Sequence, residues 1–358
     1  MPRTVPFPAV TPTQTTLTDH TTLRLGGPAR AFAEATSADV LVKLVAQADE
    51  AGEQVLLLGG GSNLVVGDAG FDGTVIKIST SGWQRDGDFV DVAAGQNWDE
   101  FVESMVTEGL GGVECLSGIP GSVGATPIQN VGAYGCEISE TLVSIEFYDR
   151  AAREVRTMSA ADLGFAYRAS VLKGTDAGVV LSVRFALTPD GLSVPIRYAE
   201  LARTLGVEIG ERVPVAQARE AVLGLRRGKG MVLEAADHDT WSAGSFFTNP
   251  IIPAERADVV RAHITSVVGD DVRVPEYPAD NGVKLSAAWL IERAGFAKGH
   301  QGPGGRVSLS TKHTLALTNR GDASTKDLLT LAAEVRDGVR ERFGVELHPE
   351  PLLINCHL

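Results

Sequence analysis

The chain has 358 residues, of which 44% are hydrophobic and 22% charged, and its formal net charge is −13 at pH 7. This length allows two or three domains with a substantial buried core. The acidic balance argues against a nucleic-acid partner, because nucleic-acid-binding surfaces carry an excess of Lys and Arg. No apolar run approaches the ~18 residues of a membrane helix, and residues 1–22 lack the basic-then-apolar pattern of a secretion signal. We therefore expect a cytoplasmic protein that does not insert into a membrane.

Three cysteines, Cys115, Cys136 and Cys356, form no Cys-x-x-Cys pair and no even-numbered set. This usage suits a reducing compartment, and it predicts neither a disulfide framework nor a metal site. We expect free thiols and no bound metal.

In chain order, residues 1–18 are rich in proline and lack hydrophobic periodicity, so they predict a flexible N-terminal arm. Apolar residues then recur at helical spacing from Ser37, a plausible cap, to Gly52. The pattern beyond predicts strands at 55–58, 75–78 and 89–92, a helix at 98–107, and strands at 141–149, 154–158 and 179–187. Helices are predicted at 254–268, 286–294 and 325–343.

Turn signals and composition suggest where the domains divide. Thr188-Pro189-Asp190-Gly191 is a turn signal that places a boundary near residue 190. We predict a first domain at 19–190 with lobes of about 19–83 and 84–190, a connecting segment with a substrate loop at 191–231, and a C-terminal domain at 232–358.

Two glycine-rich loops are the most informative local feature. The strand at 55–58 runs into Gly59-Gly60-Gly61-Ser62-Asn63, and the stretch between Leu116 and Cys136 is uncharged and holds several glycines. Glycine has no Cβ and tolerates positive φ, so successive N–H groups can turn inward and bind an anion. Either loop alone could be an ordinary turn. Together they predict a diphosphate-bearing ligand between two lobes, although neither fits the GxGxxG or GxxxxGK[ST] fingerprint.

Two further segments could carry chemistry. In Gly244 to Pro250, Ser245 stands before two aromatics, where a hydroxyl could transfer a proton in a dry pocket or simply bond to the backbone. No GxSxG motif surrounds Ser245, so nucleophilic hydrolase chemistry is poorly supported. Arg168 follows Tyr167, and its guanidinium could bind a carboxylate or form a structural salt bridge.

Charged residues further along the chain leave alternatives open. Arg226 and Lys229 lie one helical turn apart, and they could clamp a phosphate or form a solvated helix end. Glu346 and Glu350 lie close to the C-terminus, and Glu350 stands between two prolines. A glutamate with such a rigid backbone could serve as a placed acid, or it could belong to a turn.

Taken together, these segments closely resemble the UDP-N-acetylenolpyruvoylglucosamine reductase family, from about residue 21 to residue 354. Each string is weak alone, but in this order and spacing the set is specific. The strings are Gly59 to Asn63, Gly118 to Gly135 including Pro127-Ile128-Gln129-Asn130, Tyr167-Arg168, Gly244 to Pro250, and Leu347-His348-Pro349-Glu350. Arg197-Tyr198 resembles the tyrosine-bearing loop of one of the family's two subtypes.

The resemblance implies an α+β fold, with a two-lobed FAD-binding region of the vanillyl-alcohol-oxidase (PCMH) type and a C-terminal α+β substrate domain. Ser62-Asn63 stands where related oxidases often carry a histidine linked to FAD, so the cofactor is expected to be non-covalent. The implied cofactor-binding residues are Gly59, Gly60, Gly61, Ser62, Asn63, Gly118, Ile119, Gly121, Ser122, Gly124 and Ala125.

The implied reaction is the NADPH-dependent reduction of UDP-N-acetylglucosamine enolpyruvate to UDP-N-acetylmuramate in peptidoglycan precursor synthesis. By the family pattern, Arg168 binds and polarises the substrate carboxylate, Glu350 assists from the other side, and Ser245 donates a proton. The implied substrate contacts are Tyr198, Arg226, Lys229 and Asn249. The chain departs from common family residues at Thr248, Arg293 and His348, so the resemblance does not specify the contacts that these three residues make. We expect small-molecule partners only, and a monomer or weak oligomer.

Two other functions compete with this interpretation. A flavin oxidase that uses O2 would explain the glycine loops but not the set of Arg168, Ser245 and Glu350. A binding module without catalysis would purify colourless and show no flavin absorbance after FAD is added.

Overall fold

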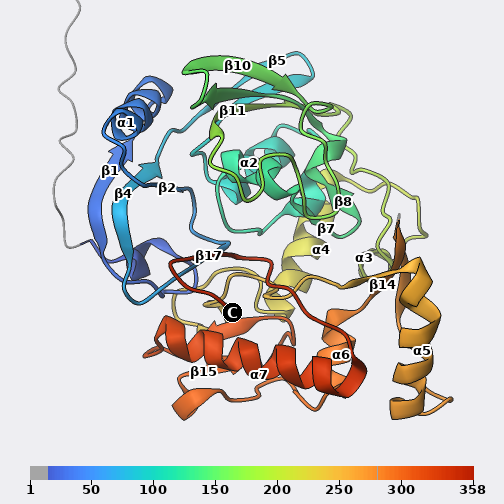
Figure 1. The fold of residues 1–358 in the computed structure, drawn as a ribbon. Helices are drawn as coiled ribbons and strands as arrows, with labels where there is room; N and C mark the ends of the chain where they lie inside the picture. The colour runs from blue at the N-terminus through green and yellow to red at the C-terminus, as the bar shows by residue number, and fades with distance from the viewer. Residues whose placement is uncertain (1–14, 280) are drawn as a thin grey trace, which may run out of the picture. The chain divides into compact units, whose positions relative to one another are not determined.

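A computed structural model describes residues 15–279 and 281–358 (Figure 1). The chain divides into two compact units. The described parts of the first unit are residues 15–16, 28–61 and 71–232, and the second unit comprises 17–27, 62–70 and 233–358. No helix among the described residues is long and apolar enough to cross a membrane.

The first unit begins with a small parallel sheet. Its strand order is β1 (Ala29–Ala35), β4 (Phe71–Ile78), β2 (Val55–Leu58). Helix α1 (Ala38–Glu50) starts where the Ser37 side chain accepts a hydrogen bond from the Val40 amide. Leu41, Leu44 and Val45 recur at helical spacing and share a buried cluster with Ile76 of β4. The first glycine loop therefore follows a strand that is fixed in this sheet.

A five-stranded antiparallel sheet forms the second lobe of this unit. Its order is β10 (Glu154–Ser159), β9 (Leu142–Asp149), β11 (Gly178–Ala186), β6 (Phe89–Ala93), β5 (Trp83–Asp86). Helix α2 (Trp98–Thr107) packs on it through Trp98 and Phe101, whose rings lie 6.1 and 5.5 Å from that of Phe185. The chain from α2 to β9 forms the short elements η2 (Glu114–Leu116), η3 (Val123–Gln129), β7 (Gly132–Ala133), β8 (Cys136–Glu137) and η4 (Ile138–Glu140).

Residues 191–231, expected as a connecting segment, fold as part of the first unit. They form α3 (Ala199–Leu205) and α4 (Val215–Gly228). Leu201 and Val222 are fully buried in the same hydrophobic cluster as Trp98. Burial of these apolar side chains is why the segment joins this core rather than forming a separate linker.

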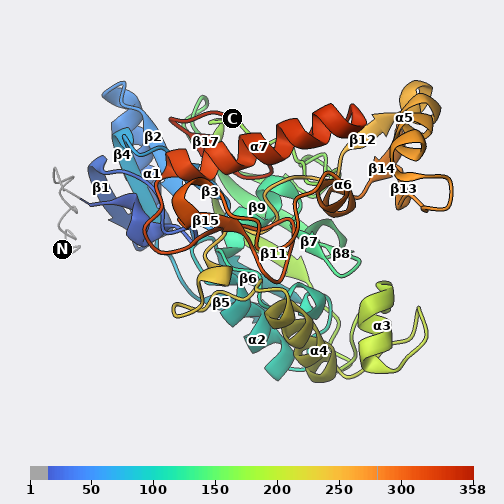
Figure 2. The same cartoon turned by 90° about the horizontal axis from the view of Figure 1, so that it is seen from below.

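The longest described helix of the second unit is α7 (Thr325–Phe343), drawn in red in Figure 2. Leu328, Leu331 and Val335 on its buried face belong to the core of this unit. Helix α6 (Ala287–Arg293) and the β15 (Val307–Leu309)–β16 (Leu317–Asn319) hairpin share this core. Helix α5 (Ala254–Val268) contacts a three-stranded sheet. The strand order of this sheet is β12 (Ile251–Pro253), β14 (Gly282–Leu285), β13 (Glu276–Ala279).

Two short segments expected in the first domain cluster instead with the second unit. Strand β3 (Leu64–Val66) pairs in parallel with β17 (Leu352–Ile354), and Val65 is fully buried in the second unit's core. The 3-10 helix η1 (Leu17–His20) begins with a buried leucine, so the expectation of a flexible arm up to residue 18 is wrong at this point. Residues 1–14 lie outside the described part of the chain.

The elements predicted from periodicity are confirmed, including α1, α2, α5, α6 and α7 and the strands β2, β4, β6, β9, β10 and β11. The strands without a prediction in the C-terminal part, such as β12, β15 and β16, are three residues long. A strand this short contains too little alternation to separate it from a loop.

We predict that Asp327→Asn lowers the free energy of unfolding by about 1–2 kcal/mol at pH 7, because Asp327 joins an N-terminal capping box to a two-point pair with Arg306. The Arg306 guanidinium holds the pKa of Asp327 well below its usual range. The carboxylate therefore stabilises the fold above about pH 4, and the difference from wild type should shrink as the pH falls below that value.

Urea titrations between pH 3 and pH 7 measure this difference. Asp337→Asn is the matched control, because Asp337 lies on the same helix and pairs on the surface with Arg336 and Arg340. An equal effect of the two substitutions would contradict the role given to Asp327.

Candidate active site

The two glycine loops touch each other in the first unit. A Cβ atom on Gly60 would lie 2.5 Å from the Cα of Gly121, and one on Gly59 would collide with the Ser122 hydroxyl. Only glycine allows the two backbones to come this close. Gly61 and Gly121 also have φ angles of +62° and +137°, in the region that favours glycine. The two loops predicted to form one site therefore meet at Gly59, Gly60, Gly121 and Ser122.

A cavity of about 330 Å³ lies against this contact. Gly59, Gly60, Gly121 and Ser122 line one part of it, and residues of the β4 end and of the approach to α2 line the rest. Lys77 is among the lining residues, and its ammonium donates to the Gly59 carbonyl. Burial lowers the pKa of Lys77. Sequence reasoning missed this lysine, because nothing in its local pattern sets it apart from a surface charge.

Several amides of the second loop already bond within the protein. The Gly118 N–H donates to the Asp99 carboxylate at 2.6 Å, and Arg219 grips the same carboxylate through two hydrogen bonds. The Gly124 N–H donates to Ala94 O, and the Ala125 N–H donates to Ser122 O. The expected cofactor residues Gly118, Gly124 and Ala125 therefore use their amides to shape the loop, and Ile119 packs against the apolar core.

The end of the first glycine loop belongs to the second unit. Ser62 and Asn63 cluster there, and the Asn63 carbonyl accepts a hydrogen bond from the Leu352 amide at 3.0 Å. Leu352 begins β17 and stands two residues after Glu350. The first loop is thus tied by its far end to the segment that carries the predicted carboxylate.

Arg168 lies beside the end of the second glycine segment in the first unit. Its guanidinium donates to Gly132 O at 2.5 Å and to Asn130 O at 3.4 Å, and it stacks over the Tyr167 ring at 5.3 Å. Its own backbone has a φ of +52°, which is strained for a residue with a Cβ. Two backbone carbonyls thus hold the head group of Arg168 in place.

Two of the predicted substrate residues, Tyr198 and Lys229, lie at one aromatic pair in the first unit. The rings of Tyr134 and Tyr198 meet edge to face at 5.5 Å, and the Lys229 ammonium lies 5.8 Å from the Tyr134 ring centre. Lys229 also forms a 2.5 Å ion pair with Glu200. Burial alone would lower the pKa of Lys229, but the Glu200 carboxylate and the tyrosines raise it above its usual value.

Arg226, which is predicted to clamp a phosphate, has a largely buried side chain in the first unit. Its Nη2 donates to the Met231 carbonyl at 2.8 Å, and its buried Nε has no hydrogen-bond partner among the described residues. Burial lowers the pKa of Arg226. Its Nε also lies 3.3 Å from the position that a Cβ on Gly118 would occupy. Arg226 therefore adjoins the second glycine loop.

The segments that carry Ser245 and Glu350 pair with each other in the second unit. The Glu350 amide donates to Phe246 O at 2.9 Å, Phe247 bridges to Pro349, and the Thr248 amide donates to His348 O. These bonds align residues 246–248 antiparallel to 348–350. Glu350 is partly buried in this pairing, whereas Glu346 is exposed.

The predicted Asn249 has a structural bond. Its side-chain oxygen accepts from the amide of Ala287, the first residue of α6, at 2.9 Å. At the positions that depart from the family pattern, Thr248 and His348 face each other in the backbone pairing, and the guanidinium of Arg293 stacks on Trp289 at 5.8 Å.

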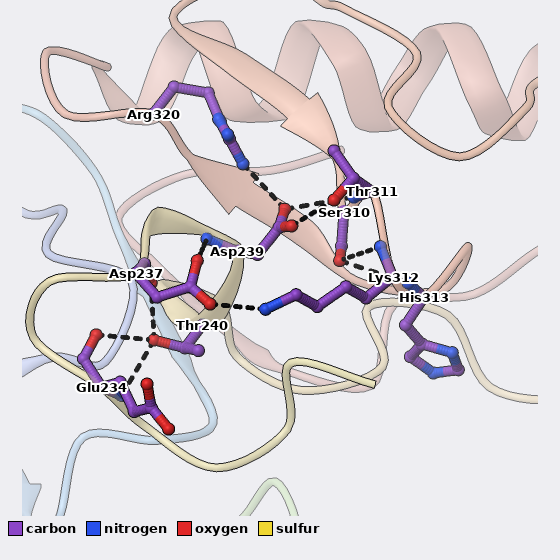
Figure 3. A network of polar contacts seen from close by, with 9 residues as sticks. All are labelled: Glu234, Asp237, Asp239, Thr240, Ser310, Thr311, Lys312, His313 and Arg320. Atoms are coloured by element: carbon purple, nitrogen blue, oxygen red, sulfur yellow. Dashed lines mark hydrogen bonds and ion pairs between the residues drawn. The ribbon is translucent and has the colours of Figure 1, made fainter. Parts of the chain in front are cut away.

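Figure 3 shows a polar network of the second unit that includes the turn carrying His313. Asp239 accepts from the Thr311 backbone at 3.1 Å, from the Thr311 hydroxyl and from Arg320 at 2.8 Å. Lys312 pairs with Asp237 at 2.6 Å. These contacts fix the turn between β15 and β16, from which His313 reaches to within 3.5 Å of the Ser245 hydroxyl. Sequence reasoning missed His313, because no motif marks it.

Of the predicted catalytic residues, Arg168 belongs to the first unit, and Ser245 and Glu350 belong to the second.

Comparison with known proteins identifies the class and then the family. Residues 29–158 match the model of an FAD binding domain, and residues 236–354 match that of the C-terminal domain of UDP-N-acetylenolpyruvoylglucosamine reductase. The first match and the two-lobed architecture define an α+β flavoprotein of the PCMH type.

Curated relatives and a solved structure make the assignment specific. A UDP-N-acetylenolpyruvoylglucosamine reductase of Saccharopolyspora erythraea is 62% identical over 96% of this chain and 95% of its own length, and one of Nocardia farcinica is 58% identical over 96% and 89%. The crystal structure of the Thermus caldophilus reductase matches with a TM-score of 0.65 at 25% identity, over 95% of this chain and 97% of that one. The chain belongs to the UDP-N-acetylenolpyruvoylglucosamine reductase family.

The residues at the glycine loops fit FAD. Close contact at Gly59 and Gly60 leaves an uncharged backbone cradle beside a cavity that contains Lys77. Such a cradle suits a diphosphate, which needs close main-chain approach and some positive charge. Ser62 and Asn63 offer no imidazole for a covalent link at this loop.

We predict that Gly60→Ala abolishes tight FAD binding or weakens it at least tenfold, because the added methyl group would lie 2.5 Å from the Gly121 backbone and force the loops apart. Flavin fluorescence titration of the apoprotein measures the affinity. Gly224→Ala is the matched control, because Gly224 lies in α4 and a Cβ there meets nothing within 4 Å. An unchanged affinity of Gly60→Ala would show that the loop contact does not shape the cofactor site.

Proposed function

We propose that this protein catalyses the NADPH-dependent reduction of the enolpyruvyl group of UDP-N-acetylglucosamine enolpyruvate, which yields UDP-N-acetylmuramate for peptidoglycan synthesis. The observation that carries the proposal is the match to the reductase family over nearly the whole chain, together with the backbone pairing of the Ser245 and Glu350 segments. This assignment favours a reductase over an O2-dependent oxidase or a non-catalytic binding module.

The cofactor and the protein have separate tasks. FAD held at the contact of Gly59, Gly60, Gly121 and Ser122 would supply the redox chemistry, which is hydride transfer from NADPH to the vinyl group of the substrate. Reduction at that carbon leaves negative charge on the neighbouring carbon, next to the substrate carboxylate. The protein must bind this carboxylate, stabilise the developing charge and supply a proton.

Arg168 binds the substrate carboxylate in this proposal. A guanidinium presents a planar fork of N–H donors that matches a carboxylate, and it keeps its charge at all working pH values. Hydrogen bonds to Gly132 O and Asn130 O hold the head group in one orientation. Charge that develops toward the carboxylate then meets a cation that needs little rearrangement.

Ser245 donates the proton in this proposal, and Glu350 assists. A hydroxyl is a weak acid, but it can protonate a strongly basic carbanion that forms beside it. The bond from the Glu350 amide to Phe246 O holds the backbone of Glu350 next to the serine segment, which supports a role for both groups at one reacting centre.

Lys229 contacts the UDP phosphates in this proposal, with Arg226 providing positive charge and Tyr198 and Asn249 completing the pocket. The ammonium of Lys229 is held by a half-exposed pair with Glu200, a type of contact that contributes little stability and exchanges readily. A diphosphate offers more negative charge than one carboxylate.

We also infer a cytoplasmic location, in which a reducing environment keeps thiols free. Cys115 and Cys136 are buried and Cys356 is partly buried, and all three are free. Fractionation of cells that produce the tagged protein tests this inference.

We predict that Ser245→Ala still lets NADPH reduce the flavin at the wild-type rate, but slows reoxidation by the enolpyruvyl substrate on the order of 10²–10³-fold, as expected for loss of a transition-state donor. Anaerobic stopped-flow absorbance at the flavin band separates the two half-reactions. Ser266→Ala, on the exposed side of α5, is the control. Equal slowing of both half-reactions would refute the proton-donor role.

We further predict that Lys229→Ala raises the dissociation constant for the UDP-sugar substrate about tenfold or more and leaves FAD affinity within about twofold of wild type, because it removes a charge-assisted phosphate contact. Calorimetric titration measures both affinities. Arg227→Ala removes a neighbouring, exposed cation and is the control. Unchanged substrate affinity in Lys229→Ala would remove this residue from the phosphate site.

A further inference from the structure

We propose that His313 is a positioning residue for Ser245, with the imidazole Nε2–H donating to the serine Oγ. This bond would direct the hydroxyl hydrogen toward the substrate and stabilise the oxygen once the proton has left. The inference rests on the proton-donor role proposed above for Ser245, and it assigns that role a partner.

The geometry places the two side chains next to each other. Nε2 of His313 lies 3.5 Å from Oγ of Ser245, and both side chains are partly buried. This is at the long end for a hydrogen bond, and catalytic hydrogen bonds often shorten only when substrate binds. The Phe246 amide donates to Leu315 O at 2.7 Å, so the backbone beside Ser245 is bonded to the backbone just after His313. The imidazole and the hydroxyl therefore stay within reach of each other.

The turn that carries His313 is held from the opposite side. The Ser310 hydroxyl accepts from the amides of Lys312 and His313 at 3.0 and 3.2 Å, and the Ala316 amide donates to His313 O at 3.1 Å. Asp239, which is 5% exposed, binds the Thr311 amide and hydroxyl. Figure 3 shows the His313 imidazole pointing away from the carboxylates of this network. The network thus fixes the backbone of the turn and leaves the imidazole directed elsewhere.

Arg320 keeps Asp239 charged and in place. Burial alone would raise the pKa of Asp239, but the hydrogen bonds from Thr311 and the pair with Arg320 lower it. Burying a charged carboxylate costs desolvation free energy, even when the carboxylate is paired and hydrogen-bonded. The effect of this arrangement is a turn with one conformation, which is what a precisely placed side chain needs.

A serine hydroxyl that gives up its proton needs a hydrogen-bond donor to its oxygen. The hydroxyl has one hydrogen and two lone pairs, so a donor on a lone pair leaves the hydrogen for the substrate. When the O–H bond breaks and the new C–H bond forms, the oxygen becomes an alkoxide, which is costly without a donor in a partly buried site. An ionised Glu350 can only accept hydrogen bonds, and Lys312 is paired with Asp237. The proton that restores the hydroxyl comes from solvent, since the net reaction consumes one.

The test compares His313→Ala and His313→Gln in anaerobic stopped-flow experiments with the FAD-loaded protein. Reduction by NADPH should stay within about twofold of wild type for both. Reoxidation by the enolpyruvyl sugar nucleotide should slow on the order of 10²-fold in His313→Ala. His313→Gln should recover most of the rate, because its amide also donates an N–H. A glutamine variant as slow as the alanine variant would overturn the donor role.

A matched control separates this role from a general effect of losing a histidine. His300→Ala removes a histidine of the same unit that pairs with Glu334 at 3.1 Å on the surface, and both half-reactions should remain at wild-type rates. Thermal melting and flavin content of each variant establish that it is folded and loaded. If His313→Ala melts at the wild-type temperature and reoxidises at the wild-type rate, the inference is wrong.

The double variant Ser245→Ala/His313→Ala distinguishes positioning from an independent structural role. If His313 acts through Ser245, the double variant reoxidises no more slowly than Ser245→Ala alone, whereas independent effects multiply. Multiplied losses would overturn the inference. If Ser245→Ala itself reoxidises normally, the proton-donor role of Ser245 is refuted. If Ser245→Ala is slow and His313→Ala is not, only the assignment of His313 fails.

The protonation state of the imidazole offers an independent readout. In a ¹⁵N spectrum of histidine-labelled protein, Nε2 of His313 should carry a proton, because the proposal requires it to donate. An Nε2 without a proton would overturn the inference.

Discussion

The cofactor site that we propose depends on two loop backbones that approach each other more closely than any side chain would allow. A Cβ on Gly60 would lie 2.5 Å from the Cα of Gly121, and the Ser122 hydroxyl takes the space where Gly59 would carry a Cβ. In this proposal, uncharged main chain is the principal surface that the first unit offers to a diphosphate, and Lys77, which donates to the Gly59 carbonyl, contributes positive charge. This arrangement also explains why a strongly acidic protein can hold an anionic cofactor: the attraction is local and does not depend on net charge.

In the second unit, backbone hydrogen bonds assemble the residues assigned to proton transfer. Phe246 is bonded on one side to Leu315 and on the other to Glu350, so three segments meet at one residue next to Ser245. Groups placed by main-chain bonds keep their spacing better than groups on free loops, and reaction rates are sensitive to about 1 Å of misplacement. The C-terminal segment is thus bonded to the segment that carries Ser245.

Charged residues support these positions from a distance. Asp99 joins Arg219 of α4 to the Gly118 amide, and Asp239 joins Arg320 to the turn before β16. In both cases a carboxylate accepts a backbone N–H from a loop and is itself held by an arginine. Such a pair fixes a loop that has too few apolar side chains to be held by packing. Each unit therefore contains a carboxylate–arginine pair that fixes a loop.

The sequence by itself determined the glycine loops, the longer helices and strands, and the family, because these depend on residue type, periodicity and spacing. It also supplied Arg168, Ser245 and Glu350 through resemblance. Only the tertiary structure decided that residues 62–70 cluster with the second unit, that α3 and α4 complete the first core, and that Lys77 and His313 lie beside the predicted residues. These features arise from hydrogen bonds and packing between segments far apart in the chain, as between Phe246 and Glu350. Local sequence patterns predict helices and strands, but they do not indicate which distant segment a residue will contact.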